Sequence, residues 1–143
     1  MVVISEQGRK ISETEVTELE RELGATLPDS YRRFLIEYNG GRPSPDIIDI
    51  VGLPGSPTDV QSFFSIGDEI ESCDLIWNLR LIDGRRTGFL PIACDSGGSR
   101  FCLRSAEGKK FEVAYLDMMN GLSLGAQYDV APSFEAFLAK LRL

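Results

Sequence analysis

The stretch FLPIACDSGGSRFCLR, residues 89–104, decides the fold class of this chain. Its two apolar runs, 89–94 and 99–104, are separated by the sequence DSGG, and two such runs joined by a Gly-containing turn are typical of a β-hairpin. A further turn signal at 107–108 leads into a third apolar run at 111–117, in which side chains alternate in character. The three runs predict an antiparallel meander with one face packed on helices.

The position of the turn also predicts which residues pair across the hairpin. With the turn at residues 97–98, Cys94 is expected to face Phe101, and Ala93 is expected to face Cys102. The two cysteines would then project from opposite faces of the sheet, where no disulfide could join them. The chain has three cysteines without CxxC spacing, so neither a disulfide framework nor a zinc site is predicted, and we expect small buried side chains.

Two amphipathic helices are predicted before the sheet. Ser12 and Glu15 have the spacing of a capping box, and apolar residues recur at helical spacing from there to Gly24. Pro28 begins a second apolar stripe, which ends at the sequence NGG, residues 39–41. The apolar positions of this second helix are Tyr31, Phe34, Leu35 and Tyr38. Because the linker between the helices is only three residues long, we expect a helical hairpin.

The middle of the chain is less regular. Residues 42–59 hold four prolines and two glycines around the apolar run 47–53, so one short strand between loops is predicted. The run 60–66 is rich in β-forming residues, and 69–82 has the spacing of an amphipathic helix. Trp77 lies outside the apolar stripe of that helix. Its side chain could fill the core or lie exposed in a binding groove, and its place off the stripe favours the groove.

Ser133 is expected to cap a last helix, whose apolar stripe is formed by Phe134, Phe137, Leu138 and Leu141. Taken together, the elements predict an α+β fold in one domain, residues 1–143. A central antiparallel sheet of about five to six strands is expected to be flanked by the N-terminal helical hairpin, the middle helix and the C-terminal helix.

The excess negative charge lies in the middle third of the chain. The net charge is -7, which disfavours direct binding to nucleic acid because phosphates attract Lys and Arg. Residues 42–83 contain eight acidic residues and two arginines, giving -6, whereas 1–41 carry -3 and 84–143 carry +2. This distribution fits a protein partner with a basic surface, and the alternative is a solvated acidic surface that keeps the protein soluble. The candidate partner-binding residues are Asp46, Asp49, Asp68, Glu69, Glu71, Asp74, Trp77 and Asp95.

The available side chains exclude several kinds of catalysis. The chain has no histidine, which removes Ser-His-Asp and Cys-His nucleophile activation and HExxH metal sites. The acids of residues 68–74 could form an acid/base pair or bind Mg²⁺, but Cys73 stands where an EF-hand loop requires Gly. We interpret them instead as a solvated helix start, and predict no catalytic residue, no metal ligand and no cofactor. No membrane-spanning or signal-peptide stretch is present, so a cytoplasmic protein is expected.

Four motifs along the chain carry a family resemblance. They are ELGATLPDSYRRFLIEYNGG (22–41), LPIACDSGGSRFCL (90–103), VAYLDM (113–118) and SFEAFLAKL (133–141). In this order they resemble the SUKH superfamily, specifically its Smi/Knr-type domain, over about residues 11–141.

The resemblance implies an α+β fold around a central antiparallel sheet and no catalytic activity. It implies a protein-binding domain, either an immunity protein that neutralises a cognate bacterial toxin, often a nuclease, or a regulator of the kind found in cell-wall synthesis and signalling. The chain is expected to be a monomer or weak homodimer that binds no membrane. Ser99 stands where the family often has Asn, which affects only the hydrogen bonding of the turn. Within the family motifs, we interpret six residues as packing and turn positions: Leu27, Pro28, Tyr31, Phe34, Gly40 and Gly41.

Overall fold

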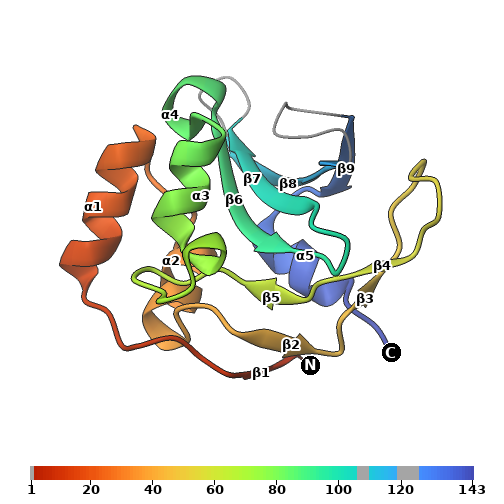
Figure 1. Ribbon diagram of the computed structural model, residues 1–143, viewed down its shortest axis with the longest axis horizontal. Helices are drawn as coiled ribbons and strands as arrows, with labels where there is room; N and C mark the ends of the chain where they lie inside the picture. The colour runs from red at the N-terminus through yellow and green to blue at the C-terminus, as the bar shows by residue number, and fades with distance from the viewer. Residues whose placement is uncertain (1, 106–109, 119–125) are drawn as a thin grey trace.

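Strands β6 (Phe89–Cys94), β7 (Arg100–Ser105) and β8 (Phe111–Leu116) form the predicted meander at the centre of the molecule (Figure 1). Strands β5 (Ser62–Phe63) and β9 (Gln127–Ala131) extend it at its two edges. The order β5-β6-β7-β8-β9 is antiparallel at every pairing. The prediction of an α+β fold with a central antiparallel sheet is therefore confirmed.

The computed structural model describes residues 2–105, 110–118 and 126–143. The turn predicted at 107–108 lies outside these residues.

Two short ribbons lie outside the main sheet. Strand β1 (Val3–Ser5) pairs with β2 (Arg42–Ser44), and β3 (Ile47–Ile48) pairs with β4 (Thr58–Asp59). Both ribbons are antiparallel, and Figure 1 shows the β3–β4 hairpin extending away from the sheet.

These ribbons correct the prediction of a single strand over 47–53. Pairing ends at Ile48, because the chain then turns back through a hydrogen bond from the Leu53 N–H to the Ile50 carbonyl at 3.2 Å. A strand also forms around Pro43, which lies opposite Ile4 in a ribbon only two strands wide. Proline is tolerated in such a place because few ladder hydrogen bonds are lost there.

The three helices with the clearest sequence signals form where they were predicted. They are α1 (Glu13–Leu23), α2 (Asp29–Glu37) and α5 (Phe134–Ala139). Ser12 and Glu15 form the complete capping box of α1, and the Ser133 hydroxyl caps α5. Side-chain caps thus start α1 and α5, whereas α2 starts after Pro28 without a side-chain cap.

Helices α1 and α2 pack as the expected hairpin. Arg32 of α2 contributes to the contact, because its guanidinium bonds Glu13 at 2.7 Å and Glu20 at 2.5 Å, both in α1. A short helix that was not predicted, α4 (Gly84–Thr87), also contacts α1.

Helices cover both faces of the sheet. Arg100 and Phe101 are neighbours in β7, so their side chains point to opposite faces. The Arg100 guanidinium donates to the Asn78 side chain in α3 (Leu75–Leu81) at 3.0 Å, whereas the Phe101 ring packs on Phe137 of α5 with centroids 5.3 Å apart. Helices α3 and α5 therefore lie on opposite faces of the sheet.

The hairpin register differs from the prediction by one residue. Cys94 pairs with Arg100, and a bulge between Pro91 and Ala93 then brings Pro91 opposite Cys102. Because Arg100 and Cys102 are two residues apart in one strand, Cys94 and Cys102 share a face of the sheet, contrary to the prediction. A turn sequence alone does not determine how many residues the turn takes up.

The cysteines are all free thiols. Cys102 is buried, which raises the pKa of its thiol, whereas Cys73 and Cys94 are half-buried. The expectation of small buried cysteines therefore holds only for Cys102.

Helix α3 starts later than the predicted helix over 69–82. The 3₁₀-helix η1 (Glu71–Cys73) precedes it, and Asp74 between them is extended, with φ -84° and ψ 128°. The Asp74 carboxylate accepts the Trp77 N–H at 2.9 Å and so caps α3. Side-chain capping at Asp74 outweighs the apolar spacing that suggested one longer helix.

The sequence NGG at residues 39–41 fastens the N-terminal segment to the core. Asn39 is 1% exposed, its amide donates to the Arg9 and Ile66 carbonyls at 3.0 and 3.1 Å, and its oxygen accepts the Ile66 N–H at 2.8 Å. Gly40 has φ +90°, and a Cβ there would lie 2.4 Å from the Ser65 hydroxyl. These residues are packing elements, as the family resemblance implied.

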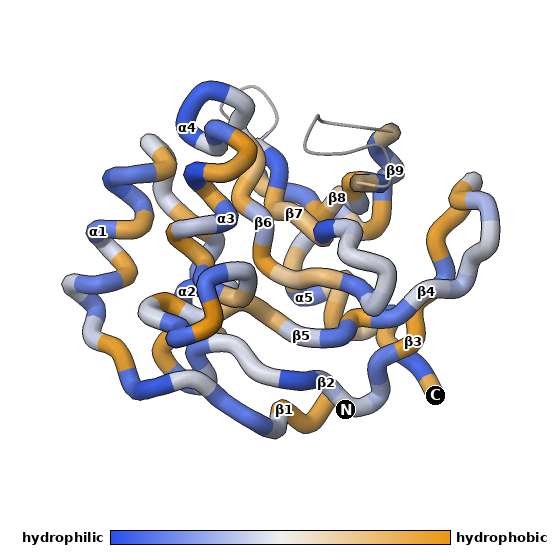
Figure 2. Tube along the Cα trace, viewed as in Figure 1, coloured by the Kyte–Doolittle hydropathy of each residue, from blue (hydrophilic) through white to orange (hydrophobic). Residues whose placement is uncertain are grey.

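The core is rich in aromatic rings that pack between α2, α5 and the sheet. The rings in mutual contact include Tyr31, Phe34, Phe63, Phe101, Phe134 and Phe137. In Figure 2 the helices show hydrophobic and hydrophilic segments in alternation, as expected for elements with one buried face.

Tyr31 provides a test of this core. It is 1% exposed, and its hydroxyl makes no hydrogen bond with any described residue. We expect Tyr31→Phe to raise the free energy of unfolding by about 1 kcal/mol, because the variant removes a buried polar group without a partner. Urea unfolding would measure this. Tyr115→Phe is the matched control and should lower stability, because the Tyr115 hydroxyl donates to Asp95 at 2.5 Å.

Candidate protein-binding surface

A groove of about 390 Å³ lies beside the start of α3. We call it the α3 groove, and its lining residues are Asp68, Glu69, Glu71, Asp74, Ile76, Trp77 and Arg80. Five of the eight predicted partner-binding residues thus come together there, four of them acidic. The structure separates them from Asp46, Asp49 and Asp95.

Two of the four acids are engaged by backbone groups. The Asp74 carboxylate accepts the N–H groups of Gly67 and Asp68 at 2.9 and 3.1 Å, in addition to capping α3. The Asp68 carboxylate accepts the Ile70 N–H at 2.8 Å. These bonds hold the loop before α3 in place, so Asp74 in particular serves the fold.

Glu69 and Glu71 are the acids available to a partner. Both are exposed, and within the described parts of the chain neither makes a side-chain hydrogen bond or ion pair. Ile70 lies between them in the sequence and is 63% exposed, which is unusual for a large apolar side chain in this protein. The groove therefore offers two free carboxylates, and an exposed apolar residue lies between them in the sequence.

Trp77 adds an aromatic surface to the groove. Its side chain is half-buried, between the two alternatives that the sequence left open. Arg80 also lines the groove, but its guanidinium bonds both carboxylate oxygens of Glu22 in α1 at 2.7 and 3.0 Å. This pairing raises the pKa of Arg80, and it means that the guanidinium is already paired within the protein. A cation from a partner would find the free glutamates and the indole face together.

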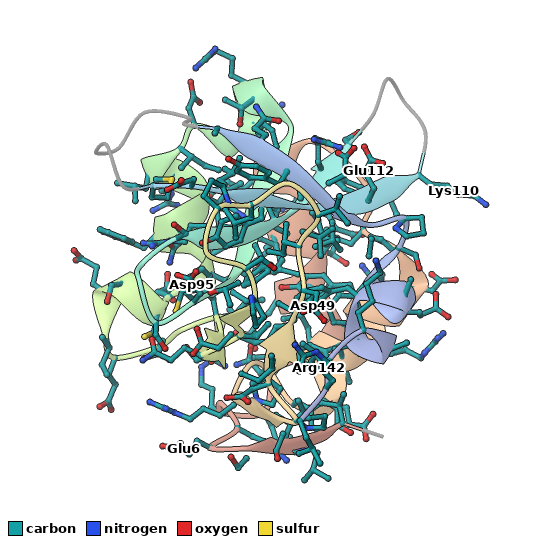
Figure 3. The ribbon with its side chains drawn as sticks, turned by 90° about the vertical axis from the view of Figure 1, so that its right-hand side faces the viewer. Glu6, Asp49, Asp95, Lys110, Glu112 and Arg142 are labelled. Carbon is teal, nitrogen blue, oxygen red and sulfur yellow. The ribbon has the colours of Figure 1, made fainter. Side chains whose placement is uncertain are left out.

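Asp46 and Asp49 lie at the base of the β3–β4 hairpin, away from the α3 groove. Both are exposed, but Asp49 bonds the Arg142 guanidinium at 2.7 and 2.8 Å, as the labelled side chains in Figure 3 show. This pair holds the pKa of Asp49 below its usual value. Asp49 therefore ties the hairpin to the C-terminal segment.

Asp95 is buried, with 4% of its surface exposed. One carboxylate oxygen accepts the Gly97 and Ser99 N–H groups at 3.1 and 2.9 Å. The other accepts the hydroxyls of Thr58 and Tyr115 at 2.9 and 2.5 Å. Burial and then this hydrogen bond raise the pKa of Tyr115. Asp95, labelled in Figure 3, was a candidate for partner binding, but its carboxylate is fully used by these hydrogen bonds to the β6–β7 turn, Thr58 and Tyr115.

Sequence reasoning missed Ile70 as a surface residue. It lies within the range 69–82 that was predicted as one amphipathic helix, whereas the structure places it before η1. Its two glutamate neighbours were no signal, because Leu19 is also flanked by two glutamates and is buried in the core.

Among the described residues, no group of three or more His, Cys, Asp or Glu side chains is placed to hold a metal ion. No helix in the described ranges is long and apolar enough to cross a membrane.

Comparison with known proteins agrees with the motif resemblance. The model of the SMI1 / KNR4 family (SUKH-1) matches residues 10–140, which is most of the chain. No curated protein matches the chain.

Proposed function

Because the chain belongs to the SMI1 / KNR4 family (SUKH-1), we propose that it is an immunity protein that neutralises a cognate bacterial toxin through the α3 groove. The family consists generally of immunity and regulatory domains that bind other proteins and are generally non-catalytic. Membership supports a binding function, and the groove supplies a candidate for the binding surface.

The observation that carries the proposal is the pair of free glutamates beside Trp77 and Ile70. A docking surface typically combines an aromatic or apolar anchor with charged groups around it. Glu69 and Glu71 supply the charge, Trp77 supplies an anchor within the groove, and the exposed Ile70 between the two glutamates supplies a second one. This combination favours binding over the alternative of a merely solvated acidic surface.

The charge of the groove suits a toxin that acts on nucleic acid. Such a toxin needs Lys and Arg side chains to hold phosphates. The carboxylates of the α3 groove can pair with the same side chains and steer the two proteins together. We infer a nuclease as the class of toxin that fits best, acting in the cytoplasm of the producing cell.

A regulatory partner is the second candidate, because the same family contains regulatory domains. The two candidates differ in the origin of the partner. An immunity protein is expected to bind, and protect against, the product of a neighbouring gene, whereas a regulator would bind a cellular protein encoded elsewhere.

The proposal is tested by reversing the two free charges. We expect Glu69→Lys/Glu71→Lys to slow association with the toxin about tenfold at low ionic strength and to reduce protection of cells that express it. Association rates would be measured by surface plasmon resonance across a range of salt concentrations, with the toxic products of adjacent genes as ligands.

The matched control is Glu18→Lys/Glu135→Lys. These glutamates are exposed on α1 and α5, outside the α3 groove, and the two variants have the same net charge. Equal slowing by both variants would show that only total charge matters and would refute the groove as the binding surface. Asp74 is left unchanged in this test, because its loss would damage the cap of α3.

A further inference from the structure

The loop at the end of the β3–β4 hairpin is an apolar protrusion. We call residues 50–57, with the sequence IVGLPGSP, the tip loop. None of its residues is charged, and Val51 is 93% exposed. Figure 1 shows the loop projecting from the body of the molecule, and Figure 2 colours it from orange to pale blue.

Internal hydrogen bonds fix the shape of the tip loop. The Leu53 N–H donates to the Ile50 carbonyl at 3.2 Å, and the Ser56 N–H donates to the Leu53 carbonyl at 3.1 Å. The Ser56 hydroxyl accepts the Ile50 N–H at 2.9 Å and closes the loop across its base. A loop fixed in this way loses little conformational entropy when it binds.

The tip loop is also anchored to the body on both sides. Ile50 is only 3% exposed, and Leu53 packs against the core. The strand that follows the loop is held by the bond from Thr58 to Asp95 and by the bond from the Ser96 N–H to Asp59 at 2.9 Å. Val51 therefore stays exposed between the buried Ile50 and the partly buried Leu53, which hold the loop against the body.

We propose that the tip loop is a second contact element, which inserts Val51 into an uncharged apolar pocket of the same protein that occupies the α3 groove. The inference rests on the proposed function, because it assigns the loop to that partner. A convex, rigid and uncharged tip fits a concave apolar pocket, since burying the exposed valine is favourable only where no polar group loses its hydration.

Charge favours a protein partner over a membrane. Asp46 is exposed near the base of the hairpin, Asp59 is half-buried there, and the whole chain carries a net charge of -7. An anionic lipid surface would repel such a molecule. The same acids would attract basic residues around the mouth of a pocket in a protein.

The first test places the photo-crosslinking residue p-benzoylphenylalanine at position 51 or 70 in the full chain, in producing cells. Position 3 is the control, because Val3 is also apolar and 64% exposed but lies in β1. We expect positions 51 and 70 to crosslink to one and the same protein, and position 3 not to do so.

The second test measures affinity for that crosslinked protein after purification. We expect Val51→Asp to weaken binding at least tenfold, because it places a charge in an uncharged apolar contact. Val3→Asp should bind as tightly as the wild type. Vesicles of phosphatidylcholine and phosphatidylglycerol serve as the membrane probe, and sedimentation of the protein with them that depends on Val51 would overturn the proposal.

The outcomes separate this inference from the proposed function. Crosslinking at position 70 alone would reject the tip loop and leave the α3 groove standing. Crosslinking at position 51 alone, with loss of affinity in Val51→Asp, would support the tip loop and reject the groove. Crosslinking at neither position would reject both, and so would unchanged affinity for the partner in both Val51→Asp and the Glu69 and Glu71 reversals.

Discussion

Asp95→Ala is expected to lower the free energy of unfolding by about 3–5 kcal/mol. Its carboxylate accepts four hydrogen bonds, from Gly97, Ser99, Thr58 and Tyr115, while only 4% of its surface is exposed. Each buried donor that loses its acceptor costs about 1–3 kcal/mol, although relaxation of the turn recovers part of this. Chemical denaturation followed by far-UV circular dichroism would measure the loss.

Two further variants separate the contributions to this network. Asp95→Asn keeps the shape of the side chain but replaces one acceptor oxygen with a donor. We therefore expect its free energy of unfolding to lie between those of the wild type and Asp95→Ala. Tyr115→Phe removes a single bond and should cost about 1.5–3 kcal/mol, since its acceptor is a carboxylate. If Asp95→Ala were as stable as the wild type and instead weakened partner binding, Asp95 would be a surface contact after all.

Asn39→Ala is expected to lower the free energy of unfolding by a comparable amount, about 3–5 kcal/mol. The substitution removes three hydrogen bonds and leaves the Ile66 N–H and carbonyl buried without their partner. Asn39 also has φ +49°, a left-handed conformation that Asn tolerates better than Ala. The midpoint and slope of urea unfolding would measure the effect.

Asn39→Gly is the control that isolates the backbone contribution. Glycine loses the same hydrogen bonds but adopts positive φ without strain, so it should be about 1 kcal/mol more stable than Asn39→Ala. Equal stabilities would show that the backbone conformation carries no cost. A loss below 1 kcal/mol in both variants would contradict the role of Asn39 in fastening the N-terminal segment.

These predictions affect how binding experiments are designed. Of the candidate partner-binding acids, Asp74 and Asp95 hold the fold, and Asp49 is paired with Arg142. Substituting them would mix loss of structure with loss of contact. Glu69 and Glu71 can be changed without breaking a described interaction, and for this reason they carry the test of the proposed function.

The helices and the meander could be predicted because their signals are local. The capping box at Ser12 and Glu15, and the apolar stripe that begins at Tyr31, involve residues within one or two helical turns. The strands β1 and β2 were missed because each owes its pairing to a partner about forty residues away in the chain, and Pro43 argued against a strand.

The candidate site was predicted in part. The acidic segment before α3 and Trp77 do line one groove, as a cluster in the sequence suggested. The burial of Asp95 could not be predicted, because two of its donors, Thr58 and Tyr115, are 37 and 20 residues away. The exposed Ile70 was misplaced for the opposite reason, since its local spacing suggested a helix that Asp74 cuts short.

The sequence by itself determined the type and order of the main elements, the family, and the absence of histidine chemistry. These follow from near neighbours and composition, which do not depend on how the chain is folded. Only the tertiary structure decided which carboxylates remain free, because folding brings hydrogen-bond donors from distant parts of the chain to some carboxylates and not to others. It likewise decided that Val51 is exposed while the preceding Ile50 is buried, since burial depends on what packs around a residue.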